Sequence, residues 1–218
     1  MDVKKIAVVL SGCGHKDGSE ITEAVSTLIA LSEMKAQYQL FAPDQVVAAV
    51  NHLTDAQEDS RNALNEAARI GRGKVKNLNT LKSANFDALI FPGGFGAAKV
   101  LCNFAQAGHK CEVLGEAERV INEFYKEEKP IAALCIAPAL VARVLGHKGV
   151  TVTIGNDLAT ASEIKKTGAH HEDCAVGDYV TDREHHLITT PAYMYSQAQP
   201  HEVFYGIRRA IKELVEMA

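Results

Sequence analysis

The chain has 218 residues, 47% of them hydrophobic, and a formal net charge of −4. This length is typical of one domain, or of one domain with an insertion, and the apolar content is enough for a sizeable core. The weak negative charge supplies no basic surface for nucleic acid, and no apolar run is long enough to cross a membrane. We therefore expect neither a nucleic acid nor a membrane as a partner.

The cysteines are odd in number and contain no C-x-x-C pair. This pattern favours reduced thiols in a cytosol-like compartment over a disulfide framework or a zinc site. The first residues, M-D-V-K-K-I-A-V-V-L, lead into an apolar run without a secretory or transit-peptide pattern. The sequence therefore predicts a cytoplasmic protein. The cysteines are Cys13, Cys102, Cys111, Cys135 and Cys174.

Apolar runs and helical periodicities alternate along the chain. Strands are predicted at residues 6–10, 38–42, 86–91, 130–134, 150–154 and 187–190. Helices are predicted at residues 19–34, with Ser19 as N-cap, and at 60–70, 113–126, 159–167 and 201–217, with another opening at Pro138.

This alternation indicates an α/β fold in which helices cover a mainly parallel sheet. The segment 45–82 is long for a plain connection, so we interpret it as an insertion that could serve as a lid. Unusual loops follow three strands, at residues 11–19, 92–98 and 135–137. The carboxyl ends of parallel strands share one edge of a sheet, so these loops are expected to converge.

Cys135 ends the apolar run 130–134, and Pro138 opens a helix almost at once. A cysteine on a sharp strand-to-helix turn lies in front of a helix N-terminus, where the helix dipole favours a thiolate. The functional hypothesis is a nucleophilic cysteine. The alternative is a small buried core residue, the usual fate of a free cysteine.

Gly93, Gly94 and Gly96 allow the backbone to approach another group closely. Neither a G-x-x-x-x-G-K-[ST] nor a G-x-G-x-x-G pattern is complete, which disfavours a phosphate cradle. The alternative is an oxyanion hole, in which the N–H of Gly94, with or without that of Gly93, faces the N–H of Ile136 across Cys135. A tight turn without chemistry is the third interpretation.

Glu20 and Glu23 lie three residues apart and so share one face of a first helical turn. Acidic residues at a helix N-terminus complement the helix dipole, and this structural role alone would explain why both residues are acidic. The functional hypothesis is that one carboxyl points at Cys135, where burial would raise its pKa and let it donate a proton.

The histidines give a weaker signal. His170 and His171 are candidate proton relays, but neighbours on an extended segment point to opposite faces, so at most one would reach the site. A metal site formed by these histidines with Asp173 and Cys174 would have splayed ligands. We expect no metal.

Signature segments span nearly the whole chain in order, and together they resemble the ThiJ/PfpI superfamily, which is related to class I glutamine amidotransferase domains. The resemblance is strongest to its ElbB branch and the mitochondrial counterparts of that branch. The segments are L-S-G-C-G at 10–14, D-G-S-E-I-T-E-A at 17–24, F-A-P-D at 41–44, N-H-L-T at 51–54, E-A-A-R-I at 66–70, P-G-G-F-G-A-A-K at 92–99, C-I-A-P-A at 135–139 and T-T-P-A-Y-M at 189–194.

The resemblance implies a flavodoxin-like three-layer sandwich, a single domain over residues 1–218 with an insertion at about 45–82, and a homodimer. It implies Cys135 as nucleophile, Glu23 as the carboxyl touching it, with Glu20 as second choice, and Gly94 and Ile136 as the oxyanion amides. The implied activity is a glyoxalase type that converts a small dicarbonyl such as glyoxal to glycolate without glutathione, cofactor or metal. Protein deglycation has been proposed as the underlying activity.

One departure from the superfamily matters. The protease-like branch has histidine directly after the cysteine, where this chain has Ile136, and the histidine that another branch places after the next strand corresponds to Gly155. The relay would then use Glu23, water or a histidine from elsewhere. The alternative function is a non-catalytic redox or carbonyl sensor. A dinucleotide site at G-C-G, residues 12–14, is a third and weaker interpretation.

Overall fold

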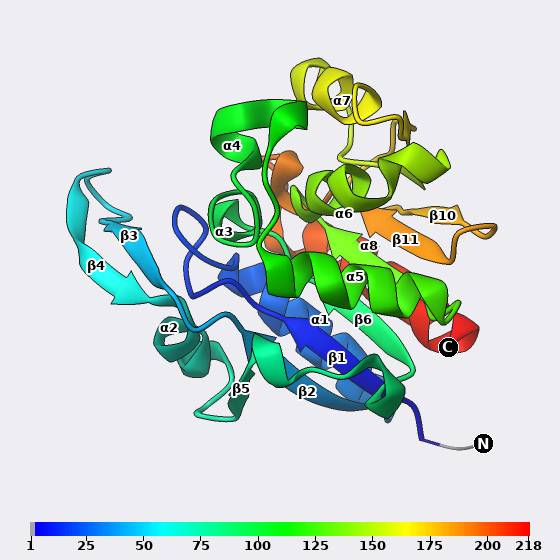
Figure 1. Ribbon diagram of the computed structural model, residues 1–218, viewed down its shortest axis with the longest axis horizontal. Helices are drawn as coiled ribbons and strands as arrows, with labels where there is room; N and C mark the ends of the chain where they lie inside the picture. Colours follow the sequence, from blue (N-terminus) through cyan, green and yellow to red (C-terminus); the bar gives the residue numbers. More distant parts are fainter. Residues whose placement is uncertain (1–2) are drawn as a thin grey trace.

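The computed structural model describes residues 3–218. Its centre is a seven-stranded sheet in the order β10-β11-β7-β6-β1-β2-β5, parallel except for β10 (Figure 1). The predicted α/β fold with a mainly parallel sheet is confirmed. The main-sheet strands are β1 (Lys5–Val9), β2 (Gln37–Ala42), β5 (Val75–Asn77), β6 (Ala88–Phe91), β7 (Ile131–Leu134), β10 (Val180–Asp182) and β11 (Leu187–Thr190).

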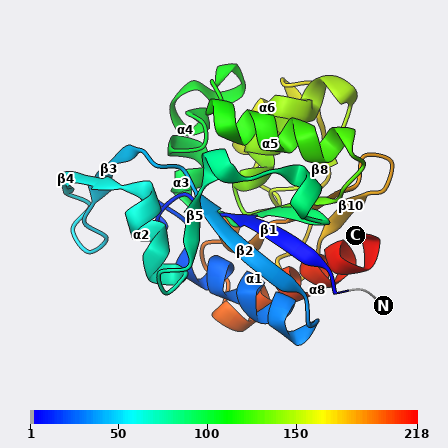
Figure 2. The same cartoon turned by 60° about the horizontal axis from the view of Figure 1, so that its bottom comes forward.

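Helices cover both faces of this sheet, giving three layers. Figure 2 shows α5 and α6 on one side of the sheet and α1 and α8 on the other. The helices are α1 (Ile21–Glu33), α2 (Ala63–Ile70), α3 (Phe95–Lys99), α4 (Phe104–Ala107), α5 (Gly115–Lys126), α6 (Ala137–Leu145), α7 (Leu158–Lys165) and α8 (Pro200–Met217). Single 3-10 turns lie at Leu78–Thr80, Ser83–Asn85, Gly108–Lys110, Gly146–Lys148 and Ala192–Met194.

The central strands are apolar throughout because both of their faces are buried. In β1, Ala7 and Val9 pack into the core beneath α5 and α6, whereas Ile6 and Val8 pack into the core beneath α1 and α8. Strands buried on both faces have continuous rather than alternating apolar sequences. This explains why the runs at 6–10 and 130–134 were recognisable from sequence.

The segment 45–82 has more structure than a simple insertion. It contains an antiparallel hairpin, β3 (Val46–Val50) and β4 (Gln57–Asn62), which projects from one side of the molecule (Figure 1). Its last strand, β5, joins the main sheet as an edge strand beside β2. The helix begins at Ala63, not residue 60, because β4 continues to Asn62, whose side chain accepts the Asn65 N–H at 3.0 Å and caps the helix.

Two further predictions need correction. The N-cap of α1 is Glu20 rather than Ser19, because the Ser19 hydroxyl instead accepts the N–H of Ser11 at 2.9 Å. The strand predicted at 150–154 is too long, because only β8 (Thr151–Val152) forms a regular strand there. It pairs with β9 (His170–His171), which was not predicted. No helix within residues 3–218 has the length and apolar character needed to cross a membrane.

Candidate functional site

Cys135 lies at the junction of β7 and α6. Its N–H continues the strand pairing by donating to the carbonyl of Thr190 at 2.9 Å, but its φ of 58° then turns the chain sharply into the helix. A non-glycine residue in this left-handed region costs roughly 1–3 kcal/mol. Pro138 in the first turn of α6 leaves no N–H unsatisfied there. The turn aims the thiol at the sheet edge.

Glu23, from the first turn of α1, is fully buried beside this thiol. Its Oε2 accepts the N–H of Gly93 at 2.9 Å, its Oε1 accepts the N–H of Tyr193 at 3.2 Å, and it hydrogen-bonds the Cys135 side chain. Burial, reinforced by the charge of Glu20, raises the pKa of Glu23 to about 8. The carboxyl therefore holds its proton at neutral pH and can donate to sulfur.

Cys135 is controlled by opposing effects. Burial and the negative charge of an ionised Glu23 raise the pKa of its thiol, whereas backbone hydrogen bonds from Gly94 and Ile136 lower it. The repulsion disappears once Glu23 is protonated, because a neutral carboxyl has no charge and its O–H stabilises sulfur. The sequence-based expectation of a thiolate favoured by the helix dipole alone therefore omitted the larger effect of burial.

The two amides expected to form an oxyanion hole, those of Gly94 and Ile136, both point at the Cys135 sulfur. The amide of Gly93, the optional third member, does not serve there. Its N–H donates to Glu23 instead, so its role is to hold the carboxyl. Glu20 lies nearby, but its Oε2 accepts the N–H of Glu23 at 2.7 Å and caps α1.

Gly93 is required by close packing. A Cβ at this position would overlap the Cβ of Cys135 and the Oε2 of Glu23. We expect Gly93→Ala to push the thiol and the carboxyl apart, and to lower the free energy of unfolding by about 1–3 kcal/mol, as overpacking typically does. Denaturant unfolding and the Cys135 alkylation rate measure both effects. Gly115→Ala is the control, because no atom lies within 4 Å of a Cβ there; equal behaviour of the two variants would contradict the account.

A cleft of about 480 Å³ opens above Cys135. Glu23 is not among its lining residues, so the carboxyl lies beneath the cysteine, while the cleft is closed on other sides by residues from several loops. The lining residues are His15, Glu20, Gly94, Phe95, Cys135, Ile136, Asp157, Thr160, Tyr193, Met194 and Ser196.

The structure does not bring the two predicted relay histidines to this cleft. His170 is exposed on β9, away from the lining residues. The side chain of His171 is 1% exposed, and its Nε2 accepts the N–H of Ile154 at 3.2 Å. It therefore supports the backbone after β8, and neither of the two histidines lines the cleft. Residues 3–218 contain no group of three or more His, Cys, Asp or Glu side chains arranged to hold a metal ion.

Sequence reasoning missed His15, which does line the cleft. It lies in the loop 11–19, which was expected to converge on the site and contains this single histidine, so a signal was available. Tyr193 and Met194 were also missed, although they belong to the T-T-P-A-Y-M segment after β11. That segment meets Glu23 through the backbone N–H of Tyr193, a contact for which the residue type carries no signal.

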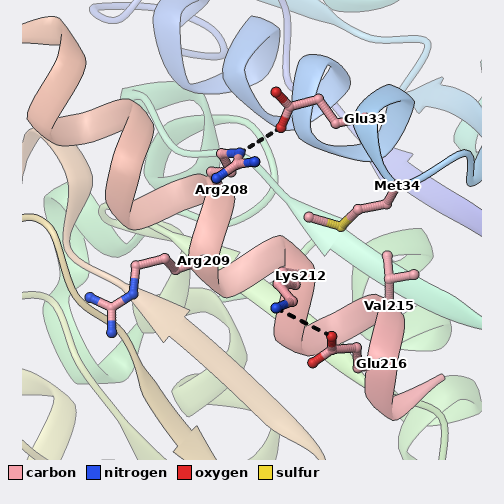
Figure 3. A pocket seen from close by; sticks show the side chains of 7 residues that line it. All are labelled: Glu33, Met34, Arg208, Arg209, Lys212, Val215 and Glu216. Carbon is pink, nitrogen blue, oxygen red and sulfur yellow. Dashed lines mark hydrogen bonds and ion pairs between the residues drawn. The ribbon is translucent and has the colours of Figure 1, made fainter.

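A second hollow, of about 460 Å³, lies between the ends of α1 and α8 (Figure 3). Its charged groups are all paired: Arg208 contacts Glu33 at 2.6 Å, and Lys212 lies 3.6 Å from Glu216. Arg209 lies 3.3 Å from Asp178, outside the hollow. No thiol or histidine lines it. We therefore assign the candidate site to the cleft above Cys135.

Comparison with known proteins places this arrangement in a family. The profile of the DJ-1/PfpI family matches residues 15–196, a range that contains Cys135 and Glu23. The chain belongs to the DJ-1/PfpI family. The resemblance to the ThiJ/PfpI superfamily is thereby confirmed, together with the amidotransferase-like sandwich fold.

Three relatives of this DJ-1/PfpI family member are informative. The "ES1 protein homolog, mitochondrial" of Rattus norvegicus is 43% identical, covering 98% of this chain and 84% of the relative. The human "Glutamine amidotransferase-like class 1 domain-containing protein 3, mitochondrial" is 44% identical, covering 98% and 83%. The crystal structure of an Ehrlichia chaffeensis "isoprenoid biosynthesis protein with amidotransferase-like domain" has a TM-score of 0.91 at 35% identity, covering 98% and 100%.

More distant structures share only the fold. Drosophila melanogaster DJ-1beta, for example, has a TM-score of 0.56 at 16% identity, over 99% of this chain and 97% of that one. One prediction is overturned by the curated relatives. The expectation of a cytoplasmic protein is wrong, because the relatives that match nearly the whole chain are named as mitochondrial proteins.

Proposed function

We propose that this protein is a glyoxalase-type enzyme that converts a small dicarbonyl such as glyoxal to its hydroxy acid, glycolate, through covalent attachment to Cys135. The observation that carries the proposal is the sulfur at the floor of a cleft, contacted by the Glu23 carboxyl and by the N–H groups of Gly94 and Ile136. Such donors stabilise the alkoxide that forms when sulfur adds to a carbonyl.

In the proposed reaction, the Cys135 sulfur forms a bond to one aldehyde carbon, and the electron pair of that C=O bond moves onto oxygen. The proton lost by sulfur ends on this oxygen, with Glu23 as the exchanging group beside sulfur. The remaining hydrogen on the attacked carbon then moves to the second carbon, and the hydroxyl proton of the adduct passes to the second oxygen, which leaves a thioester with a terminal hydroxyl group. Water cleaves the thioester, releasing glycolate and the thiol. The sum is one glyoxal and one water giving one glycolate, with no external oxidant or reductant.

The surroundings of Cys135 support carbonyl addition more than amide hydrolysis. A cysteine hydrolase needs a base in contact with its nucleophile. Here the next residue is Ile136, and the only titratable partner of the sulfur in the described structure is Glu23, which at its raised pKa of about 8 acts as a proton donor at neutral pH.

The charge of the cleft supports an uncharged substrate. Two carboxylic side chains line it, Glu20 and Asp157, and no lysine or arginine does. An anionic substrate would meet like charges without a compensating cation. We therefore expect glyoxal to be converted with a higher kcat/KM than glyoxylate is consumed.

The test of the proposed function measures glycolate formed from glyoxal beside peroxide titration of Cys135 followed by mass spectrometry. Many glycolate molecules per protein, and little product from glyoxylate, are the expected result. Stoichiometric oxidation of Cys135 with negligible turnover would instead support the alternative, a redox or carbonyl sensor.

A further inference from the structure

The proposed reaction needs a base that reaches the substrate carbons, and Glu23 is poorly placed for that step. Both of its oxygens accept backbone N–H groups, from Gly93 and Tyr193, and it does not line the cleft. It can exchange a proton with sulfur from below. The hydrogen that moves between the two carbons lies on the other side of the sulfur, inside the cleft.

Three side chains with an imidazole or carboxyl group line the cleft: His15, Glu20 and Asp157. Glu20 uses Oε2 to cap α1, and Asp157 uses Oδ1 to accept the N–H of Thr160 at 2.7 Å. The hydrogen bond to Thr160 holds the pKa of Asp157 below its usual range, which makes it a weak base. His15 differs, because no hydrogen bond within residues 3–218 engages its ring.

The β3–β4 hairpin fixes the position of His15. His52, in the turn of this hairpin, contacts the His15 ring edge to face, with ring centroids 5.1 Å apart. Two hydrogen bonds fix the His52 ring: Nε2 accepts the N–H of Lys16 at 3.2 Å, and Nδ1 lies 3.0 Å from the carbonyl of Val50. This pair of contacts requires the neutral tautomer with hydrogen on Nδ1.

Further contacts tie the same hairpin to the loop 11–19. Asp17 accepts the N–H of Val50 at 2.8 Å, and Lys16 pairs with Asp55. Gly14 makes room for the approach, because a Cβ there would overlap the ring of His52. On the other side, the N–H of Phe95 donates to the carbonyl of His15 at 2.7 Å and joins the loop to the start of α3.

We propose that His15 carries the hydrogen between the two carbons of the bound dicarbonyl, and that His52 of the β3–β4 hairpin positions its ring. This inference rests on the proposed function and goes beyond it by giving the hairpin a role. His15 takes the proton from the attacked carbon, the C–H electron pair forms the C=C bond of an enediol, and the C=O pair of the second carbon moves onto its oxygen, which takes a proton from water. His15 then returns its proton to the second carbon, and the hydroxyl of the attacked carbon loses its proton to water as its C=O bond forms. The base is regenerated, and no electrons enter or leave.

The electrostatic surroundings keep His15 in the form this step needs. Desolvation by burial lowers the pKa of His15, as do the positive charge of Lys16 and that of His52 when its ring is protonated, whereas Asp17 and Asp55 oppose them with smaller effects. The other titratable groups of the cleft are Glu20, Cys135, Asp157 and Tyr193. The imidazole is therefore the neutral base at pH 7 and becomes protonated only in more acidic solution.

The decisive experiment follows glyoxal conversion in D₂O, with kcat and the deuterium content of glycolate carbon as readouts. A proton held by imidazole exchanges with solvent, so wild-type glycolate should carry deuterium on carbon. We expect His15→Ala to lower kcat by about 100-fold or more, as loss of a general base does, and added imidazole to restore part of it. His52→Ala should lower kcat by about tenfold through misplacement of the His15 ring, and shift the acidic limb of the pH profile.

Matched variants show whether a negative result contradicts the role of His15 or the proposed function itself. His147→Gln, at an exposed histidine far along the chain, should behave as wild type. The iodoacetamide reactivity of Cys135 should be unchanged in His15→Ala. Two results would overturn the role of His15 and leave the proposed function intact. The first is a His15→Ala variant that converts glyoxal as fast as the wild type does. The second is glycolate that lacks deuterium when made by Glu20→Gln or Asp157→Asn but carries it when made by His15→Ala. Absence of glyoxal turnover in the wild type would overturn the proposed function and the inference together.

Discussion

Replacement of Cys135 by alanine is expected to reduce conversion of glyoxal to glycolate to the rate in buffer alone. The variant removes the atom that forms the bond to substrate, and neither Glu23 nor the two amides can replace a nucleophile. The fold should persist, because alanine has the same Cβ as cysteine at the positive φ of this turn. Glycolate formation and the thermal midpoint of unfolding measure the two expectations.

Cys13 provides the matched control. It is a half-buried cysteine in the loop after β1, and it does not line the cleft. Cys13→Ala should retain wild-type conversion. Conversion of glyoxal at the wild-type rate by a folded Cys135→Ala variant would show that the reaction does not pass through this sulfur.

Removal of the Glu23 carboxyl should change how stability depends on pH. The folded-state pKa of Glu23 is about 8, against an ordinary value of 4.5, so the folded protein binds a proton between these pH values that the unfolded chain has lost. The contribution of Glu23 is therefore fully present below pH 4.5 and is lost as the pH rises through 8. Over this window the loss amounts to about 5 kcal/mol, at about 1.4 kcal/mol per pH unit.

Glu23→Gln should eliminate this dependence on pH. It should also lower the free energy of unfolding by an amount that does not change with pH, because the NH₂ group of glutamine must lie against the N–H of either Gly93 or Tyr193. Urea unfolding of both proteins from pH 5 to pH 8 measures the difference, which should move in favour of the variant as the pH rises. Glu118→Gln, at an exposed position of α5 outside the cleft, is the control and should retain the wild-type pH dependence of stability and the activity. Parallel profiles for wild type and Glu23→Gln would contradict a protonated Glu23.

The central sheet was predictable from sequence because β1, β6 and β7 are buried on both faces, which makes them continuous apolar runs. The segment 45–82 was not predicted in detail. Its strand β4 (Q-E-D-S-R-N) is polar and mostly exposed, whereas the apolar run of β3 (V-V-A-A-V) offered a signal that the prediction did not use. The short strands β9 and β10 contain only two and three residues, below the length at which a pattern can be recognised.

The candidate site was likewise predictable from sequence only in part. The turn at Cys135 could be predicted because the strand, the cysteine and Pro138 are adjacent in sequence, and the spacing of Glu20 and Glu23 gave two candidate carboxyls. The structure distinguishes them: Glu23 is enclosed against the sulfur, whereas Glu20 caps the helix and faces the cleft. The role of Gly93 depends on its N–H, and that of His15 on a hairpin more than thirty residues away in sequence. Neither follows from local pattern.

Ile136 gives this site its particular chemistry. Its backbone N–H contacts the sulfur, but its side chain supplies no base where the protease-like branch of the superfamily has histidine. Proton transfer is then divided between a buried carboxyl beneath the sulfur and groups that line the cleft above it. Such a division suits addition to a carbonyl and rearrangement of the adduct, in which protons move at two separate atoms.

The most direct test of covalent catalysis by Cys135 is mass spectrometry of the protein quenched with acid during steady-state turnover of glyoxal. We predict that the peptide containing Cys135 carries the mass of one glyoxal, that this adduct decays once glyoxal is exhausted, and that Cys13 stays unmodified. Steady formation of glycolate while Cys135 remains entirely unmodified would contradict the account.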